Sequence, residues 1–576
     1  MNGGEIIARF LKAQGVRFLF TLCGGHIAPI LVACQAAGIR VVDTRHEATA
    51  VFAADAVSRL TGTIGVAAVT AGPGATNTIT AVKNAQLAGS PLLLLGGATA
   101  TLLKGRGALQ DIDQMALMKP HVKWQTSVGR LKDLLPALHT AVKKAREGVP
   151  GPVFVECPVD LLYPPQLVRQ WYLKEGGSGQ GLRGRLLHWY LRRHVNRLFA
   201  GGEDGPVEAI APPAPRSPSR SALARFTTML RQAERPVLLL GSQAMRLPEL
   251  AAQLPAALEK LGIPVFLSGM ARGLLGRNHP LQCRHQRRQA LRQADLVCLA
   301  GVPCDFRLDY GRQFSRKAAY GAVNINRKEL RLNRKPTLAL AADPAAVLLQ
   351  LAEQPGISAE KWTDWLSRLK ENDRQREAEI DRMAAKTTDY LNPLALLRKV
   401  EAALPEDTIL VGDGGDFVAS ASYVLHPRGP YGWLDPGPFG TLGVGAGFAL
   451  AAKLCRPQSQ VWLIYGDGAA GFSLMEFDTF ARHRLPIVAL VGNDGSWMQI
   501  AREQVELLGA PTGTELARCD YHQVAQGLGG VGLCLSDLQQ VGSVLRRAVQ
   551  LAGGEQPVLI NALLGRTEFR KGSISM

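Results

Sequence analysis

The sequence predicts an α/β protein of three domains, each built on a parallel sheet with helices around it. Short apolar runs typical of buried strands alternate with segments of helical periodicity along most of the chain. Such alternation is typical of parallel sheets. At 576 residues with 47% hydrophobic content, the chain is also long enough for about three to four domains of ordinary size.

The first domain is expected over residues 1–165, with helical patterns at 5–14 and 47–60 and strand patterns at 16–21, 39–43, 63–70 and 153–156. A linker is expected over 166–230. A central α/β domain over 231–360 follows, with strands at 237–240, 265–267, 296–300 and 322–325. A charged helical connector over 361–390 leads to the last α/β domain, 391–576, with strands at 408–411, 461–465, 487–491 and 558–562.

The linker contains a basic amphipathic segment between two flexible stretches. Residues 176–181 and 206–220 have linker composition. Between them, apolar residues recur at three- and four-residue spacing, together with five arginines and Trp189. Such a helix can lie in the interface of an anionic bilayer, and it can equally pack on its own protein. A membrane surface is therefore a candidate partner.

The composition narrows the classes of partner and compartment. Lys plus Arg is 66 and Asp plus Glu is 48, a net charge of +18, which favours acidic small molecules, anionic lipid or nucleic acid. No nucleic-acid-binding module appears, so no nucleic acid partner is expected. Nine cysteines without metal-binding spacing indicate reduced thiols in a reducing compartment. Neither a signal peptide nor a transmembrane helix is expected.

Two strand ends in the last domain carry the most informative pattern. The apolar run 461–465 ends at Gly466-Asp467-Gly468, and the run 487–491 ends at Asn493-Asp494. Mg²⁺ takes about six oxygen ligands and usually only one or two protein carboxylates, leaving the rest to phosphate and water. Asp467 and Asp494 therefore predict a magnesium-held diphosphate beyond the strand ends. The alternative is a plain turn, since Asp and Gly are common in turns.

With these residues the chain resembles the thiamine diphosphate (ThDP) enzymes of the acetolactate synthase and 2-hydroxyacyl-CoA lyase group. The family signature is Gly-Asp-Gly, a spacer of this length, and Asn-Asn; here Asp494 stands where the family usually has the ligating Asn. The resemblance implies three doubly wound parallel-sheet domains: a pyrimidine-binding domain, a central domain and a diphosphate-binding domain. It implies ThDP and Mg²⁺ as cofactors, with Asp467, Asp494 and Ser496 as candidate metal ligands.

The resemblance also implies a pyrimidine-binding half in the first domain. Glu47, in Arg45-His46-Glu47, is the expected catalytic acid that holds the pyrimidine nitrogen, although an acidic residue also suits the first turn of a helix. Gln110 is expected to position a substrate oxygen, with a surface glutamine as the alternative. The other expected cofactor contacts lie in two glycine-rich turns: Gly24, Gly25, Gly72, Gly74 and Asn77.

In the last domain, the resemblance places three groups of residues at the cofactor. The turn after strand 408–411 supplies Asp413, Gly414 and Gly415 near the diphosphate. Leu442 is the candidate that wedges the two cofactor rings into a bent shape, and a core leucine would look the same in sequence. The start of the helix after Asp467 supplies Gly468, Ala469 and Ala470, whose backbone N–H groups can bind phosphate.

The reaction implied is cleavage of a 2-hydroxyacyl-CoA to formyl-CoA and an aldehyde one carbon shorter, a step of fatty acid α-oxidation in lipid metabolism. An acetolactate synthase-type carboligase acting on pyruvate and a non-catalytic binding protein are the alternatives. The central domain is expected to bind the nucleotide part of an acyl-CoA-type substrate, with Arg272 and Arg277 as candidate phosphate partners.

Assembly and location are further implications of the resemblance. The family builds its sites between subunits, which implies a homodimer or homotetramer. Membrane-associated members normally carry an amino-terminal membrane segment, and none is seen in this sequence. The implied location is therefore peripheral, on the cytosolic face of the endoplasmic reticulum membrane.

Overall fold

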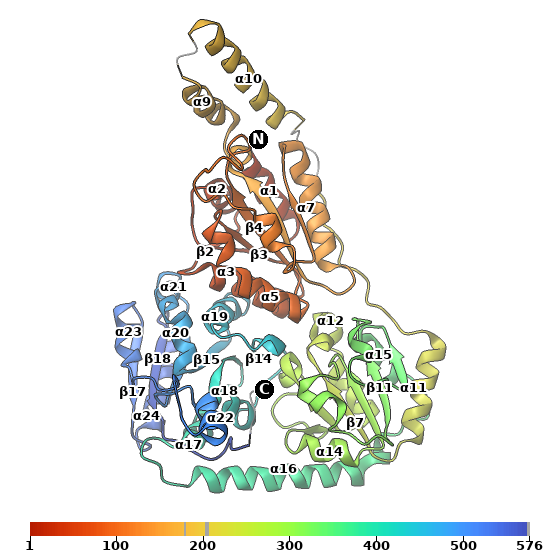
Figure 1. Cartoon of the computed structure of the whole chain (residues 1–576). Helices are drawn as coiled ribbons and strands as arrows, with labels where there is room; N and C mark the ends of the chain where they lie inside the picture. Colours follow the sequence, from red (N-terminus) through yellow and green to blue (C-terminus); the bar gives the residue numbers. More distant parts are fainter. Residues whose placement is uncertain (178–179, 202–206, 573–576) are drawn as a thin grey trace. The chain divides into compact units, whose positions relative to one another are not determined.

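The computed structural model describes residues 1–177, 180–201 and 207–572 (Figure 1). It contains three six-stranded parallel sheets, which confirms the predicted fold class. The chain forms two compact units. The first holds residues 1–59 and 63–213 and one sheet, and the second holds residues 60–62 and 214–576 and the other two sheets.

The sheet of the first unit has the strand order β2-β1-β3-β4-β6-β5. Its strands are β1 (Phe18–Thr21), β2 (Arg40–Asp43), β3 (Gly65–Val69), β4 (Leu92–Ala98), β5 (Trp124–Ser127) and β6 (Pro152–Pro158). Its helices are α1 (Gly3–Ala13), α2 (Ala28–Ala36), α3 (Glu47–Thr61), α4 (Pro73–Thr76), α5 (Ile79–Ala88), α6 (Gln114–Met118), α7 (Leu131–Arg146), α8 (Val159–Leu162), α9 (Pro165–Glu175) and α10 (Gly181–Phe199). Residues of α1 and α7 pack with strand residues in one apolar core.

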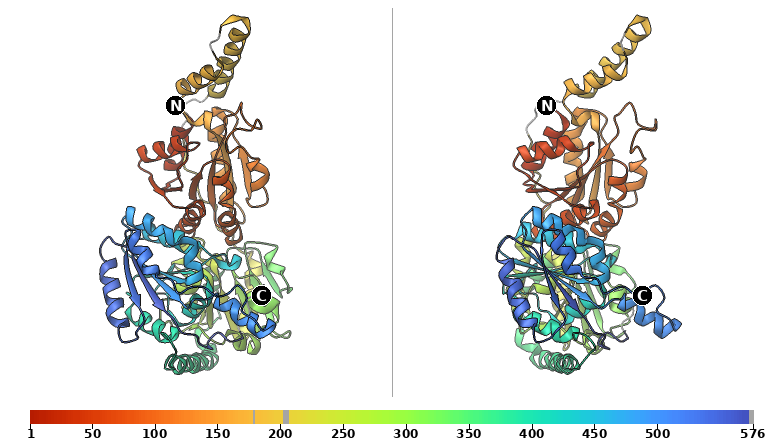
Figure 2. Two further views of the ribbon diagram at one scale, coloured as in Figure 1. Left: turned by 60° about the vertical axis from the view of Figure 1, so that its left-hand side comes forward. Right: turned by 90° about the vertical axis from the view of Figure 1, so that its left-hand side faces the viewer.

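The basic amphipathic segment of the linker forms α10, as predicted. Helices α9 and α10 extend beyond the sheet of the first unit (Figure 2, yellow-orange). Residues 207–219 have no regular structure, and the part up to Pro213 belongs to the first unit. The side chain of Gln14 donates to the carbonyl of Glu208 and accepts from the backbone N–H of Ile210. Within the described ranges, no helix is long and apolar enough to cross a bilayer.

The second unit contains two sheets, with orders β12-β11-β10-β7-β8-β9 and β14-β13-β15-β16-β18-β17. The strands of its central sheet are β7 (Pro236–Leu240), β8 (Val265–Leu267), β9 (Gln282–Cys283), β10 (Leu296–Ala300), β11 (Ala319–Val323) and β12 (Leu338–Leu340). The strands of its last sheet are β13 (Thr408–Asp413), β14 (Trp433–Leu434), β15 (Gln460–Gly466), β16 (Ile487–Asn493), β17 (Val531–Leu535) and β18 (Val558–Leu563). The strand predicted at 322–325 is displaced: β11 begins at Ala319, opposite Leu296, and ends at Val323.

The helices of the second unit surround these two sheets. Around the central sheet lie α11 (Arg220–Gln232), α12 (Pro248–Ala251), α13 (Leu254–Leu261), α14 (Arg287–Gln293) and α15 (Pro344–Ala352). Around the last sheet lie α17 (Pro393–Ala403), α18 (Gly415–Val424), α19 (Val444–Cys455), α20 (Asp467–Ser473), α21 (Phe477–Arg482), α22 (Met498–Leu508), α23 (Tyr521–Gly527) and α24 (Val541–Ala552). Short 3₁₀ turns occur at Ser242–Met245, Gly269–Gly273, Phe306–Gly311, Glu329–Arg331, Ala359–Trp362, Gly437–Phe439 and Leu474–Glu476.

Helix α16 (Thr363–Ala384) connects the two sheets of the second unit (Figure 1). At its start, the indole N–H groups of Trp362 and Trp365 donate to the carbonyls of Ala233 and Pro236, each at 3.0 Å. Near its end, Ile380 is buried in the core of the last sheet. The helix is therefore fastened to both sheets by buried side chains.

Candidate active site

Glu47 is the first residue of α3, shortly after β2. It is buried, and its Oε2 accepts a hydrogen bond from Asn77 Nδ2 at 3.0 Å. Asn77 directly follows α4, in the turn that leaves β3. Strands β2, β1 and β3 are neighbours, so the loops after them emerge together at the carboxyl edge of the sheet. The structure thus brings the predicted acid and the predicted glycine turn into one place.

The glycine turns of the first unit pack closely on one another. A Cβ at Gly24 would lie 2.5 Å from the Cβ of Thr70, and one at Gly74 would lie 2.8 Å from the Cγ2 of the same residue. A Cβ at Gly72, which has φ +62°, would lie 2.7 Å from the carbonyl oxygen of Gln110. Gln110 therefore lies against the Gly72 turn, whereas a Cβ at Gly25 would meet open space.

Gln114 supports this turn and was not found from the sequence. Its buried side chain accepts from the backbone N–H of Gly72 at 3.3 Å and donates to Glu156 Oε2 at 3.0 Å. The same amide also donates to the carbonyl of Gly97 at 3.0 Å. A buried polar side chain that is fully hydrogen-bonded fixes its neighbours, so Gln114 is a positioning residue for the Gly72 turn.

In the second unit, Asp413 connects the end of β13 to the turn that carries Leu442. Its two carboxylate oxygens accept from the backbone N–H groups of Gly443 at 3.0 Å and Gly445 at 2.8 Å. Burial raises the pKa of Asp413 to about 7. Next to it, Gly414 has φ +60°, and a Cβ there would lie only 2.0 Å from Leu442 Cδ2. Leu442 is therefore held against the glycine turn rather than in an apolar core.

Asp467 lies at the end of β15, buried, with both oxygens hydrogen-bonded to backbone. Oδ1 accepts from the N–H of Gly468 at 2.8 Å, and Oδ2 accepts from Gly495 at 2.8 Å and Ser496 at 3.2 Å. Burial raises its pKa. The Gly466 N–H donates to the Gly414 carbonyl at 3.3 Å, so the two glycine turns of this half lie side by side.

Asp494 follows β16 and faces Asp467. Its pKa is raised to about 7, first by burial and then by repulsion from Asp467 and Asp416. Its Oδ1 is buried and has no hydrogen-bond partner among the described residues, and the same holds for Oδ1 of Asn493. A partnerless carboxylate oxygen next to a second carboxylate is electrostatically costly, and a divalent cation would satisfy it. The donor set thus fits Mg²⁺.

The remaining predicted residues of this half lie as follows. Ser496 donates its hydroxyl hydrogen to the carbonyl of Thr514 at 3.1 Å, which leaves the oxygen lone pairs. Gly468 packs under Trp497, since a Cβ there would lie 2.3 Å from the indole ring. Ala469 and Ala470 are buried in α20. No group of three or more His, Cys, Asp or Glu side chains that could hold a metal ion occurs in the described ranges, so a cation here would take its remaining ligands from other groups.

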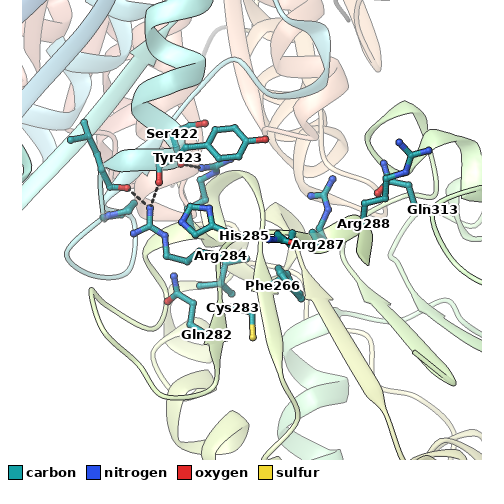
Figure 3. Close-up of a pocket in the computed structure, with 15 residues that line it drawn as sticks. Phe266, Gln282, Cys283, Arg284, His285, Arg287, Arg288, Gln313, Ser422 and Tyr423 are labelled. Carbon is teal, nitrogen blue, oxygen red and sulfur yellow. Dashed lines mark hydrogen bonds between the residues drawn. The ribbon is translucent and has the colours of Figure 1, made fainter. Parts of the chain in front are cut away.

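A basic pocket opens elsewhere in the second unit, between the segment after β9 and α18 (Figure 3). Its volume is about 440 Å³, and four arginines line it without an acidic residue: Arg272, Arg284, Arg287 and Arg288. Tyr423 stacks on His285 across the pocket, with ring centroids 6.2 Å apart. Arg277, the other candidate phosphate partner, does not line the pocket and pairs with Glu401 at 3.1 Å.

Two of the pocket arginines, Arg272 and Arg284, have N–H groups without a hydrogen-bond partner among the described residues. Arg284 donates from Nη2 to the carbonyls of Tyr423 and Leu425, each at 2.9 Å, while its Nη1 is buried without a partner among the described residues. Burial lowers the pKa of Arg284 to about 10. Arg272 donates to the Ser422 carbonyl at 2.9 Å, and its Nε is likewise partnerless. Four guanidinium groups without an acidic residue in the lining give the pocket a positive potential, which attracts anions.

Three family descriptions match the chain in succession. Residues 1–117 match the N-terminal TPP binding domain of thiamine pyrophosphate enzymes, residues 223–351 match the central domain, and residues 413–562 match the C-terminal TPP binding domain. These ranges contain, respectively, Glu47, Arg272 and the two aspartates Asp467 and Asp494.

Relatives match along the whole chain. A protein named 2-hydroxyacyl-CoA lyase 2 from Bos taurus is 54% identical over 587 residues, covering 100% of this chain and 92% of the relative. The protein of the same name from Homo sapiens is 53% identical with the same coverage. A probable acetolactate synthase from Mycobacterium bovis is 36% identical, covering 98% of this chain and 96% of the relative.

Proposed function

Because the chain belongs to the thiamine pyrophosphate enzymes, in the branch of the 2-hydroxyacyl-CoA lyases, we propose that it is a Mg²⁺-dependent lyase acting on 2-hydroxyacyl-CoA. The bond between C1 and C2 breaks. The hydroxyl-bearing carbon becomes an aldehyde one carbon shorter, and the thioester carbon leaves with a hydrogen as formyl-CoA. The two products together contain all atoms of the substrate, so no oxidant is needed. This reaction belongs to fatty acid α-oxidation.

When bound, thiamine diphosphate supplies the attacking carbon and takes up the electron pair of the broken bond. The protein's first task is to hold the pyrimidine nitrogen, and Glu47 is suited to it. Asn77 occupies Oε2 of Glu47, which leaves Oε1 for the cofactor. Gln110, held against the Gly72 turn, is proposed to position a substrate oxygen.

The second task is to hold the diphosphate. Asp467 and Asp494 would bind Mg²⁺, with Ser496 as a candidate third ligand. Gly414 and Gly415 allow close approach of backbone, since both have positive φ. The observation that carries this part of the proposal is the partnerless Oδ1 of Asp494 beside a second carboxylate, because a bound cation would offset the repulsion between the two carboxylates.

The basic pocket supports an acyl-CoA-type substrate, whose nucleotide end carries phosphate groups. Replacing both Arg287 and Arg288 by Gln should raise KM for the acyl-CoA about tenfold or more, since a charge-assisted hydrogen bond contributes about 1.5–3 kcal/mol. The turnover number should change little, because these residues do not reach the reacting atoms in the proposal. Arg292→Gln, on the exposed side of α14, is the matched control and should leave KM unchanged.

Product analysis tests the reaction. Purified protein with ThDP, Mg²⁺ and 2-hydroxyacyl-CoAs of different chain length should yield formyl-CoA by mass spectrometry, and Glu47→Gln should yield almost none. Acetolactate formed from pyruvate, without formyl-CoA, would instead favour the synthase that the Mycobacterium bovis relative's name describes.

A homodimer or homotetramer is part of the proposal, because the pyrimidine-binding and diphosphate-binding residues lie in separate compact units. Co-expressing Glu47→Gln and Asp467→Ala chains tests for sites shared between chains. A mixed dimer would then contain one intact site and one doubly defective site, and random pairing would restore about a quarter of the activity. If each site were built within one chain, no activity would return.

A further inference from the structure

The outward face of α10 carries large apolar side chains that are exposed to solvent. Leu182, Leu186 and Trp189 follow one another at four- and three-residue spacing, which places them on one face of the helix. Their exposed fractions are 78%, 57% and 58%. Exposed apolar side chains gathered in this way mark an interaction site rather than ordinary surface.

The opposite face of α10 fastens the helix to the first unit. Leu191, Val195 and Leu198 have the same four- and three-residue spacing, begin nine residues after Leu182, and are buried. His194 Nε2 lies 3.0 Å from the hydroxyl of Thr101. Helix α10 is therefore fixed on the first unit by its buried face, and its other face remains exposed to solvent.

Positive charge surrounds the exposed apolar face. Arg183, Arg185, Arg192, Arg193 and Arg197 are all exposed, and residues 180–201 contain no Asp or Glu. No ion pair of these arginines occurs among the described residues. The guanidinium of Arg193 lies over the Trp189 ring, 5.4 Å from its centroid. A matching partner would offer an apolar region for the leucines and the tryptophan, and negative charge around that region for the arginines.

We propose that this face of α10 docks on an anionic lipid bilayer, with Leu182, Leu186 and Trp189 among the acyl chains and the arginines among the phosphate headgroups. Trp has an apolar ring and a polar N–H, which suits the boundary between headgroups and acyl chains. Arginine binds phosphate through paired donors. The proposal is independent of the reaction that the enzyme catalyses.

A second copy of the same face is a poorer partner. Two such helices in contact would bring ten arginines together without a carboxylate from either helix, and like charges at an interface are strongly unfavourable. A bilayer containing phosphatidylserine supplies negative charge and an apolar interior at once. Charge complementarity therefore selects the lipid surface.

Vesicle flotation with the full-length protein tests the proposal. The protein should float with vesicles of phosphatidylcholine and phosphatidylserine, bind vesicles of phosphatidylcholine alone much more weakly, and dissociate as salt is raised. Replacing Arg185, Arg192 and Arg193 by Gln should weaken binding about fivefold for each arginine removed. Replacing Leu182, Leu186 and Trp189 by Ser should abolish stable flotation even at low salt.

A matched variant controls for net charge. Arg225, Arg292 and Arg327, exposed in the second unit, are replaced by Gln, and vesicle binding should stay at the wild-type level. Unchanged melting temperatures and ThDP binding show that each variant is folded. The proposal fails if the protein ignores phosphatidylserine vesicles or if the control variant loses as much binding as the α10 variant. It also fails if the serine variant changes the oligomeric state while binding vesicles normally.

Discussion

The buried carboxylates Glu47 and Asp494 differ in whether the chain supplies hydrogen-bond partners for them. Glu47 is buried with Oε2 already hydrogen-bonded to Asn77, a neutral side chain from the next loop. Asp494 has a buried oxygen without a partner in the described chain and stands next to Asp467, another carboxylate. The first site is ready to receive a neutral ring, whereas the second is unfavourable until a cation arrives. The comparison indicates that metal and cofactor stabilise the second half far more than the first.

The largest expected effect is that of Glu47→Gln. An amide cannot supply the proton that the pyrimidine nitrogen needs, so turnover should fall about 10²- to 10⁴-fold. Affinity for Mg²⁺ should remain at the wild-type level, since that site lies in the other compact unit. Steady-state kinetics and metal titration by calorimetry check both. Full activity in this variant would remove Glu47 from the mechanism.

The next effect is that of Asp494→Ala, which should weaken Mg²⁺ binding at least about tenfold, as losses of metal-site residues do. Asp494→Asn keeps an oxygen ligand and removes the charge, so it is the matched control. In the metal-free protein this Asn variant should melt at a higher temperature than wild type, because a repelled, buried carboxylate has gone. Equal Mg²⁺ affinity in the Ala variant and wild type would contradict the proposed metal site.

A smaller effect is expected for Asn77→Ala, which leaves Glu47 in place but removes its partner. A hydrogen bond to a charged group contributes about 1.5–3 kcal/mol, so ThDP affinity or turnover should fall about tenfold or more, yet by less than in Glu47→Gln. Titration of ThDP and steady-state rates are the measurements. Asn77→Asp should be worse than Ala, since it places a like charge beside Glu47.

The smallest effect concerns Asp413. Both of its carboxylate oxygens accept hydrogen bonds from backbone N–H groups, so this carboxylate has more hydrogen-bond partners than Asp494. Its pKa is raised from 3.8 to about 7 by burial, so the folded protein holds this proton more tightly than the unfolded chain. The resulting stability is present at low pH and is lost as pH rises from 3.8 to 7. The melting temperature of the cofactor-free wild type should therefore fall more steeply over this window than that of Asp413→Asn. Parallel curves would show that Asp413 does not titrate there.

The central strands of the sheets could be predicted from the sequence, because they are continuous apolar runs buried on both faces. Strands β7, β10 and β16 begin within a residue of the predicted start. The edge strand β2 was predicted at 39–43, but the other five edge strands were missed: β5 has the polar sequence Trp-Gln-Thr-Ser, β9 and β14 have two residues each, and β12 and β17 were not identified. Strand β4 was also missed, although Leu92–Leu95 carries the same apolar signal as its neighbours.

The candidate site was predictable where function rests on local motifs and not where it rests on distant pairs. Glycine turns and strand-end aspartates are readable in a few consecutive residues. The bond between Gln114 and Gly72 joins positions 42 residues apart, and nothing in the local sequence marks it. The pocket arginines after β9 look like ordinary surface residues in sequence, and only the fold of the second unit shows that Arg284 is enclosed beneath Tyr423.

Helix α16 has a practical consequence for dissecting the enzyme. The indoles of Trp362 and Trp365 at its start are hydrogen-bonded to the central domain, and Ile380 near its end packs in the core of the last sheet. A shortened protein that kept only the last sheet and this helix would expose the two tryptophans to water. One cut before the helix would lose Ile380 from the core of the last sheet. The two sheets are thus expected to melt, and to tolerate gene fragmentation, as a single piece.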